Sequence, residues 1–457
     1  MKIIIVGCGK AGYALARNLS AEKDLDVTII DCKPESLEKA NETLDAMLIK
    51  GDGLNSDTLL EAGAKGAELV IAVTEADERN ILSCILAKQI GIRYSIARVR
   101  TPEYAFNTNK FWKGLGLDMI INPELQTAQE ISRLLRFPTV DDIDIFVSGK
   151  VELVSFNVSE ASDFFVGKSV SDVFYLKKMN VLLATIEREH SVIIPHGDCV
   201  FEKDDIIRVL GYAPNIMGFF SLIGKNTGKI KNTTIIGGGR ITYYLVDMLQ
   251  KYSKGTKVKI IETDREKCEK LSVKFPHCLI INGDGTDESV LALEDTDKMG
   301  AVVCLSDKDE QNAIVSLYSL QFGMRKVIVK LNQINSNMVK NLKLGSIISP
   351  QNISSEQIIR YTRALRYSSS GVKTIHKIFD NNDDRVEAVE LNVNKKCKCL
   401  DIPLKNVRMK KDILIGCIIR NSSIIIPTGE SVMSLWDSII IIAKNEDINE
   451  LDDILYL

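Results

Sequence analysis

Residues 3–12 read Ile3-Ile4-Ile5-Val6-Gly7-Cys8-Gly9-Lys10-Ala11-Gly12, an apolar run that ends in a glycine-rich loop. A short β-branched run predicts a buried strand, and the glycines predict a tight turn into a helix. The same design returns half a chain later as Ile235-Ile236-Gly237-Gly238-Gly239-Arg240-Ile241-Thr242. Because an internal repeat constrains the architecture before any single motif is interpreted, we expect two copies of one strand–loop–helix unit.

The composition is that of an ordinary globular protein. Hydrophobic residues make up 45% of the 457 residues and charged residues 26%, and this length allows roughly three domains. Basic residues number 58 and acidic residues 61, which leaves a net charge of −3 and no whole-chain electrostatic reason to bind nucleic acid. No apolar run approaches the roughly 18–20 residues that span a bilayer. We therefore expect a soluble protein that starts with a strand rather than a signal peptide.

The ten cysteines are scattered, without a Cys-x-x-Cys pair. The closest spacing is Cys397-Lys398-Cys399, and no histidine cluster accompanies it. We expect reduced thiols that serve as small apolar residues, as in a cytosolic protein, and no metal site. Cys8 is the exception, because a thiolate at a helix N-terminus would be activated.

Strands and helices alternate after each glycine loop. In the first copy the expected strands are Val27–Asp31, Met47–Ile49, Leu69–Val73, Tyr94–Val99 and Met119–Ile121, and the expected helices are Ala11–Leu19 and Glu78–Ile90. Right-handed crossovers place such helices on both faces of a parallel sheet. The fold class expected for each copy is therefore α/β, a Rossmann-like doubly wound parallel sheet.

The two copies match in order over most of their length. Gly7 matches Gly237 at an offset of 230, and Asp31 matches Glu262 at 231. At an offset of 232 the matched pairs are Asp52 and Asp284, Thr74 and Ser306, Asp77 and Asp309, Glu78 and Glu310, Asn80 and Asn312, and Arg98 and Lys330. The chain is therefore a duplication.

A smaller, strand-rich segment follows each copy. Val151–Val158 recurs as Val386–Val393, and Ile193–Asp198 recurs as Ile425–Glu430. The first segment also carries a predicted short helix near Ser169–Phe174. We expect small α+β domains here, so that the four domains span 1–138, 139–215, 231–366 and 372–457. Crossing helices are predicted at Pro123–Arg136 and Pro350–Arg366, and the stretch Tyr212–Asn232 joins the halves.

The first glycine loop has the spacing of a dinucleotide-binding loop. Gly7 permits the tight turn, Gly9 lets backbone amides approach a pyrophosphate, and Gly12 lets helix and strand pack closely. The phosphates would lie at the helix N-terminus, where free N–H groups and the helix dipole favour an anion. Asp31, 19 residues after Gly12, would accept hydrogen bonds from ribose hydroxyls and repel a 2′-phosphate. This favours NAD(H) or an adenine nucleotide over NADP.

The second loop departs from this pattern because Thr242 stands in place of the third glycine. Its side chain must fit where helix meets strand, so we expect a looser or altered site. Both loops carry a cation at one position, Lys10 and Arg240. A cation in the first turn of a helix is unfavourable unless an anion joins it, which favours a bound di- or triphosphate; side chains pointing into solvent are the alternative. Arg98 and Lys330 either contribute similarly or pair with local carboxylates.

With the duplicated loops, the Gly-Asp-Gly sites at 51–53 and 283–285, the run Thr74–Asn80 and the paired small domains in view, the whole chain resembles the TrkA family. These are the peripheral nucleotide-binding subunits of bacterial Trk potassium uptake systems. The resemblance implies two RCK (KTN) N-terminal domains, each followed by an RCK C-terminal domain. It also implies a cytoplasmic homo-oligomeric ring, a dimer or tetramer, beneath a membrane potassium-translocating subunit of the TrkH or TrkG type. In this family bound NAD(H) and/or ATP/ADP alters transport, and no chemistry is done on the ligand.

The resemblance also assigns ligand-binding residues by position. In the first site these are Gly7, Cys8, Gly9, Lys10, Ala11, Gly12, Asp31, Val73, Thr74 and Arg98, with Asp52 in the Gly-Asp loop. In the second site they are Gly237, Gly238, Gly239, Arg240, Ile241 and Glu262. Catalytic and metal-binding residues are not among them.

Two other functions stay open on the residues alone. An NAD-dependent dehydrogenase would need an acid or base facing the nicotinamide, but the four histidines, at positions 190, 196, 277 and 376, do not match between the copies. The second alternative is an assembly ring with vestigial loops. The intact first loop argues against it, while Thr242 leaves it open for the second half.

Overall fold

The chain divides into two compact units. The computed structural model describes residues 1–20, 25–105, 109–138, 140, 142–146, 150–173, 179–189, 191–224, 230–252, 255–287, 300–332, 344–366, 372–380, 384–394, 397–421, 423–446 and 448–456. The first unit comprises 1–131, 233–323 and 327–359, and the second comprises 132–232, 324–326 and 360–457. The large and small domains alternate along the chain, yet the two large domains share one unit and the two small domains share the other.

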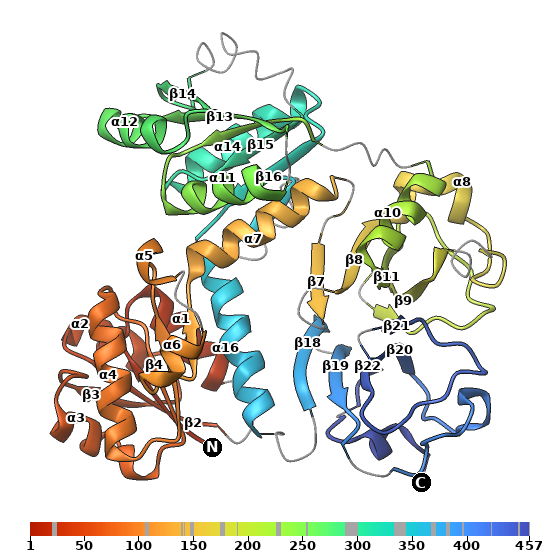
Figure 1. The fold of residues 1–457 in the computed structure, drawn as a ribbon, viewed down its shortest axis with the longest axis horizontal. Helices are drawn as coiled ribbons and strands as arrows, with labels where there is room; N and C mark the ends of the chain where they lie inside the picture. The colour runs from red at the N-terminus through yellow and green to blue at the C-terminus, as the bar shows by residue number, and fades with distance from the viewer. Residues whose placement is uncertain are drawn as a thin grey trace. The chain divides into compact units, whose positions relative to one another are not determined.

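The first large domain is drawn in red and orange in Figure 1. It is a six-stranded sheet in the order β3-β2-β1-β4-β5-β6, and all neighbouring strands are parallel. The strands are β1 (Lys2–Val6), β2 (Asp26–Asp31), β3 (Met47–Lys50), β4 (Leu69–Ala72), β5 (Tyr94–Arg98) and β6 (Met119–Ile121). The helices are α1 (Lys10–Ser20), α2 (Pro34–Asn41), α3 (Ser56–Glu61), α4 (Asp77–Ile90), α5 (Pro102–Ala105), α6 (Asn109–Gly114) and α7 (Pro123–Arg136). The strand order reverses between β1 and β4, and doubly wound sheets bind ligands at the crevice beyond such a point.

The second large domain repeats this sheet strand for strand, in the order β14-β13-β12-β15-β16-β17. Its strands are β12 (Asn232–Ile236), β13 (Lys257–Glu262), β14 (Leu279–Asn282), β15 (Ala301–Cys304), β16 (Lys326–Lys330) and β17 (Ser346–Ile348). Its helices are α11 (Arg240–Tyr252), α12 (Arg265–Lys274), α14 (Asp309–Gln321) and α16 (Pro350–Arg366). The predicted duplication of a parallel α/β sheet is confirmed.

The two small domains are antiparallel sheets, in the orders β10-β9-β11-β8-β7 and β18-β19-β22-β20-β21. The strands of the first are β7 (Asp142–Phe146), β8 (Val151–Asn157), β9 (Val181–Arg188), β10 (Ser191–Ile193) and β11 (Ile206–Tyr212). Those of the second are β18 (Val372–Asp380), β19 (Arg385–Asn392), β20 (Ile413–Arg420), β21 (Ser423–Ile425) and β22 (Ser438–Lys444). One buried cluster joins residues of both sheets, among them Leu153, Leu210, Val386 and Ile440. The two small domains therefore share a core.

The predicted helix near Ser169–Phe174 is wrong over its described part. Ser169 pairs with Val200 in an isolated bridge, and Asp172 accepts hydrogen bonds from the Ser169 backbone nitrogen at 3.0 Å and hydroxyl at 2.6 Å. These bonds close a turn, and the short helix α8 lies earlier, at Ser162–Phe165. Phe174, residues 225–229 of the predicted linker and the histidine at 190 lie outside the described residues. The described part of that linker contains α10 (Ala213–Leu222).

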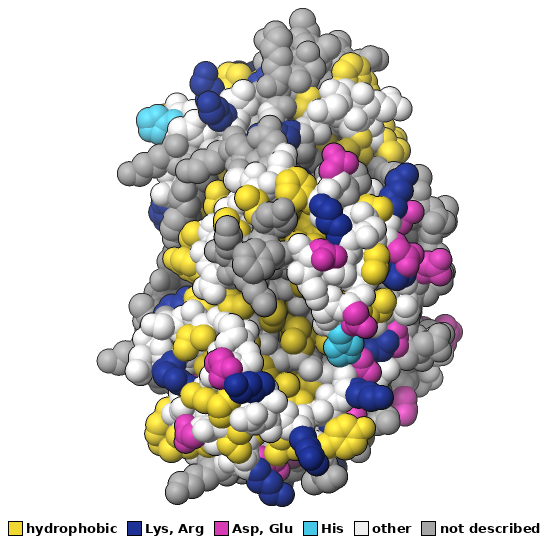
Figure 2. All heavy atoms as spheres, turned by 90° about the vertical axis from the view of Figure 1, so that its right-hand side faces the viewer, with side chains coloured by type: hydrophobic (Ala, Val, Ile, Leu, Met, Phe, Trp, Pro, Cys, Tyr) yellow, Lys and Arg dark blue, Asp and Glu magenta, His cyan; other side chains and the backbone are white. Residues whose placement is uncertain are grey.

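The visible surface carries both signs of charge. On the face in Figure 2, basic and acidic side chains are interspersed among apolar ones, as the near balance of 58 basic and 61 acidic residues leads one to expect. Across the described ranges, the helices are all too short or too polar to pass through a bilayer.

Candidate functional site

The first glycine loop joins β1 to α1 at the reversal of strand order. Gly7 has φ +103°, and a Cβ there would lie 3.1 Å from the Thr74 backbone nitrogen. At Gly12 a Cβ would lie 1.8 Å from the Gly7 oxygen. Gly9 is exposed, and a Cβ there would have no neighbour within 4 Å. Glycine is therefore needed for backbone packing at the ends of the loop, while its middle lies open to a ligand.

Asp31 ends β2 beside this loop. Its Oδ2 accepts a hydrogen bond from the Cys8 backbone nitrogen at 2.5 Å, and its Oδ1 accepts one from the Lys33 nitrogen at 2.8 Å. Burial, and then the charge of Asp31, raise the pKa of the Cys8 thiol to about 11. The expectation of an activated Cys8 is therefore wrong, because desolvation and a neighbouring carboxylate outweigh the helix dipole.

Asp52 holds the Gly-Asp-Gly loop in place. Its Oδ1 accepts a hydrogen bond from the Leu54 nitrogen at 3.0 Å and pairs with Arg79 at 2.5 Å. The Leu54 amide, and then Arg79, lower the pKa of Asp52. A Cβ at Gly53 would lie 2.2 Å from Val6, so this loop packs directly on β1.

Asn80, which is fully buried, joins the ends of β4 and β5. Its side chain accepts a hydrogen bond from the Thr74 nitrogen at 2.7 Å and donates to the Thr74 oxygen at 3.1 Å and the Arg98 oxygen at 2.9 Å. Arg98 donates from Nη2 to the Thr74 oxygen at 2.7 Å. Its Nε is buried and has no hydrogen-bond partner within the described residues. Desolvation, and then Arg100, lower the pKa of Arg98. The Arg98 guanidinium lies at the crevice with one N–H donor, at Nε, that no described residue accepts from.

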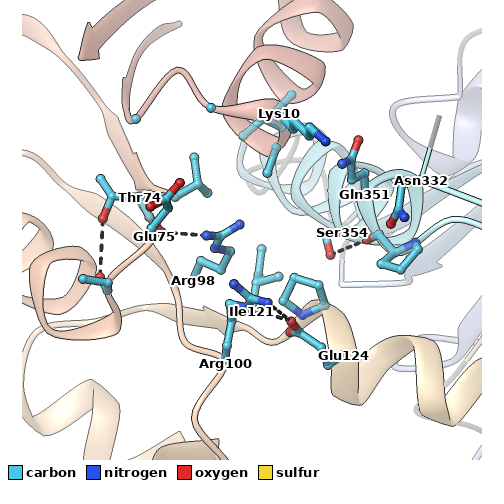
Figure 3. Close-up of a pocket in the computed structure, with 18 of the residues that line it drawn as sticks. Lys10, Thr74, Glu75, Arg98, Arg100, Ile121, Glu124, Asn332, Gln351 and Ser354 are labelled. Atoms are coloured by element: carbon cyan, nitrogen blue, oxygen red, sulfur yellow. Dashed lines mark hydrogen bonds and ion pairs between the residues drawn. The ribbon is translucent and has the colours of Figure 1, made fainter. Parts of the chain in front are cut away.

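Arg100 and Glu124 complete this end of the site, and the sequence reasoning missed both. Arg100 binds Glu124 Oε1 through Nε at 2.6 Å and Nη2 at 2.5 Å. Glu124 is 8% exposed, and its Oε2 has no hydrogen-bond partner in the described structure. Figure 3 shows Arg98 and Arg100 extending from the first sheet, with Asn332, Gln351 and Ser354 across the pocket. Arg100 lies two residues beyond the end of β5, and Glu124 lies in the first turn of α7. Neither position carries a motif that would have identified it from the sequence.

The second loop forms the same turn with different packing. Gly237 has φ +102°, and Glu262 Oε2 accepts a hydrogen bond from the Gly238 nitrogen at 2.6 Å, as Asp31 does from Cys8. Thr242 is fully buried and donates from its hydroxyl to the Gly237 oxygen at 2.6 Å. The side chain that replaces the third glycine thus binds the carbonyl equivalent to the Gly7 carbonyl, with which a Cβ at Gly12 would clash.

The second site lacks the cation that Arg100 supplies to the first, although Lys267 and Lys270 also line the cavity. Asn312 repeats the role of Asn80, donating to the Ser306 and Lys330 oxygens at 2.9 Å. Lys330 pairs with Asp307 at 3.2 Å. Of the two roles predicted for Lys330, the structure therefore contains the pairing with a local carboxylate. Neutral Asn332 and Gln351 occupy the positions that match Arg100 and Glu124.

Both loops line one cavity of about 1490 Å³ within the first unit. The predicted site residues on its wall are Gly7, Gly9, Lys10, Ala11, Asp31, Asp52, Val73, Thr74, Arg98, Gly238, Gly239, Arg240 and Ile241. The other four, Cys8, Gly12, Gly237 and Glu262, are not among its lining residues. The hydrogen bonds and packing contacts of these four residues stabilise the backbone of the two loops.

Comparison with known proteins identifies the family. Residues 3–123 and 233–350 match the TrkA-N domain. The chain belongs to the TrkA family. Residues 153–224 match the TrkA-C domain. The Trk system potassium uptake protein TrkA homolog 1 of Methanosarcina mazei is 30% identical over 461 residues, 99% of each chain. The TrkA homolog of Archaeoglobus fulgidus is 30% identical over 455 residues, 99% of this chain and 100% of that protein.

Solved structures share the fold. The crystal structure of the GsuK RCK domain has a TM-score of 0.62 at 16% identity and covers 97% of this chain and 92% of that chain. The GsuK channel bound to NAD has a TM-score of 0.62 at 15% identity, covering 97% of this chain and 76% of that one. The predicted family and fold class, TrkA with paired RCK domains, are confirmed.

Proposed function

We propose that this chain is the regulatory subunit of a potassium uptake system, which binds an adenine nucleotide at each glycine loop and gates a membrane potassium-translocating subunit of the TrkH or TrkG type. The family supports the role in potassium transport. The observation that carries nucleotide binding is the first loop, where the exposed Gly9, the Asp31 carboxylate and Arg98 line one crevice. The buried Nε of Arg98 has no hydrogen-bond partner among the described residues.

The layout of the first site suits ATP or ADP. Asp31 would accept the ribose hydroxyls, and the loop amides with the N-terminus of α1 would hold the pyrophosphate. A further phosphate would then lie beyond the ends of β4 and β5, beside Arg98 and Arg100. Guanidinium groups bind phosphate through paired, charge-assisted hydrogen bonds.

The second site suits a ligand without a third phosphate. Lys330 already has Asp307 as a partner at 3.2 Å, and Asn332 is neutral. Glu262 supports the second loop through the Gly238 nitrogen, and its negative charge would repel a 2′-phosphate. NAD(H) or ADP meets these conditions, and structures of GsuK, which shares the fold, carry the titles bound to NAD and bound to ADP.

Regulation requires a difference in binding rather than chemistry. A ligand shifts a two-state protein only as far as it binds one state better, and a nearly complete shift takes roughly 5.5 kcal/mol. Several sites on a homo-oligomeric ring, a dimer or tetramer on the cytoplasmic face of the membrane, would share this requirement. Within the described residues, no histidine lines the cavity to serve a dehydrogenase.

Thermal shift with NADH, NAD, ADP and ATP tests nucleotide binding directly. At a hundred times its dissociation constant a ligand adds about 2.7 kcal/mol of stability, so the wild type should melt at a higher temperature. Asp31→Ala should lose the shift contributed by the first site and keep that of the second. A wild type that none of the four compounds stabilises would rule the proposal out.

A further inference from the structure

The helix that follows the second loop reaches the first site. Tyr244, in α11, is 1% exposed. Its hydroxyl donates to the Arg100 backbone oxygen at 3.2 Å and accepts from Asn122 Nδ2 at 3.0 Å. A buried tyrosine hydroxyl needs hydrogen-bond partners, and Arg100 and Asn122 supply them here from the opposite copy of the duplicated fold.

Both partners belong to the phosphate end of the first site. Arg100 presents its guanidinium to the cavity and binds Glu124 in the first turn of α7. Asn122 caps the same helix, since its Oδ1 accepts a hydrogen bond from the Leu125 nitrogen at 2.8 Å. The Tyr244 hydroxyl thus contacts Arg100, which carries the cation, and Asn122. Asn122 caps α7, the helix that carries Glu124, the carboxylate partner of Arg100.

Tyr244 is also tied to the second loop. Thr242, two residues earlier, binds the Gly237 oxygen at 2.6 Å, and the Tyr243 nitrogen donates to the Gly239 oxygen at 3.1 Å. A phosphate held by the N-terminus of α11 would act on this same turn of helix. Occupancy of the second loop therefore has a short covalent and hydrogen-bonded route to Arg100.

The contact has no counterpart in the other direction. At the offset of 230 that relates the glycine loops, Tyr244 matches Ala14, which has no hydroxyl. Asn122 matches Ser349, at the offset of 227 that relates Pro123 to Pro350. The duplicated fold does not itself require this bond, so the bond is a property of the second copy acting on the first.

We propose that Tyr244 couples the two nucleotide sites, so that a nucleotide on the second loop strengthens binding of ATP at the first. The bound phosphate would order the first turns of α11 and hold the Tyr244 hydroxyl on the Arg100 backbone, which places the Arg100 guanidinium for the terminal phosphate. Tyr244 is thus a positioning residue, and the coupling is reciprocal by thermodynamic linkage. The inference rests on the proposed binding of nucleotide at both loops.

Calorimetry on the full chain tests the coupling with a matched pair of variants. Gly239→Glu blocks the second loop because its carboxylate repels phosphate. The substitution fits the fold, because a Cβ at Gly239 would have no neighbour within 4 Å. In the wild type this block should weaken ATP binding at the first site about fivefold, the low end of typical allosteric couplings. In Tyr244→Phe the same block should change nothing. Tyr243→Phe, the adjacent tyrosine, should keep the wild-type coupling.

The possible results separate the inference from the proposed function. If the first site binds ATP equally well with the second loop open or blocked in the wild type, the coupling is absent and the inference fails alone. It also fails if Tyr244→Phe retains the fivefold change. If neither loop binds nucleotide, the proposed function fails with it. Asn122→Asp provides a second variant, because it keeps the capping oxygen and removes the amide donor to Tyr244; it should reduce the coupling while α7 stays folded.

Discussion

The two glycine loops form one turn in two ways. In both, a glycine with positive φ follows the strand, and a carboxylate at the end of the next strand accepts a hydrogen bond from the second loop residue. The first loop packs its helix against bare glycine at Gly12, while the second binds the Thr242 hydroxyl. Beyond the loops, Arg100 faces the first site where Asn332 stands in the second. Duplication kept the backbone geometry, and the packing and the charge diverged.

The sharpest way to break the comparison is to exchange the residues at the third glycine position. Gly12→Thr places a Cβ 1.8 Å from the Gly7 oxygen, and overpacking of this severity should lower the free energy of unfolding by about 3 kcal/mol or more. Thr242→Gly loses one hydrogen bond and adds a flexible residue to a helix, which together cost about 2 kcal/mol. Urea denaturation measures both. Equal losses would mean that the two helices pack alike.

The middle glycines allow each site to be removed separately. A Cβ at Gly9 or Gly239 meets no atom within 4 Å, so Gly9→Glu and Gly239→Glu should leave the melting temperature of the empty protein nearly unchanged. Each carboxylate would face the ligand phosphates and weaken its own site about a hundredfold, or about 2.7 kcal/mol. Calorimetric titration with ATP and NADH should show one class of site disappear in each variant. Loss of both sites from one substitution would contradict separate sites.

The sequence predicted the fold well because periodicity and duplication constrain it strongly. Both crossing helices begin and end where expected, at Pro123–Arg136 and Pro350–Arg366, since a proline at the first turn and a basic last turn mark the ends. The matched pairs also took up matched roles: Asn80 and Asn312 form equivalent hydrogen bonds to the ends of their neighbouring strands.

The sequence could not reveal contacts between the copies. Tyr244 and Arg100 are 144 residues apart, and neither lies in a recognisable motif. The sequence also could not predict the environment of Cys8. Packing sets the distance of its thiol from solvent and from Asp31, and the position after Gly7 does not. The shared core of the two small domains likewise depends on contacts between segments that are far apart in the sequence.

A smaller effect should follow from exchanging the residues at the phosphate end. Arg100→Gln removes the cation beside Arg98 and should weaken ATP at the first site about tenfold, with a smaller loss for ADP, because a charge-assisted hydrogen bond contributes about 1.5–3 kcal/mol. Asn332→Arg should strengthen ATP at the second site by a similar factor. Titrations in the Gly239→Glu and Gly9→Glu backgrounds, respectively, isolate each site. An unchanged ratio of ATP to ADP affinity in both would show that the third phosphate does not reach these positions.

The smallest effect is expected at Cys8, which occupies the loop position of Gly238. Its pKa is raised to about 11; a raised thiol pKa keeps the protonated form below that value, so about one thiol in ten thousand is ionised at pH 7. Iodoacetamide should therefore leave Cys8 unmodified at neutral pH while it labels exposed Cys32, as peptide mass spectrometry can show. Reactivity at Cys8 should rise only as the pH approaches 11, because the thiolate is the nucleophile. Cys8→Ala should bind ATP as the wild type does, because the hydrogen bond to Asp31 comes from the Cys8 backbone nitrogen. Rapid labelling of Cys8 at pH 7, or a large loss of ATP affinity in Cys8→Ala, would instead show that the thiol has a role that the second loop lacks.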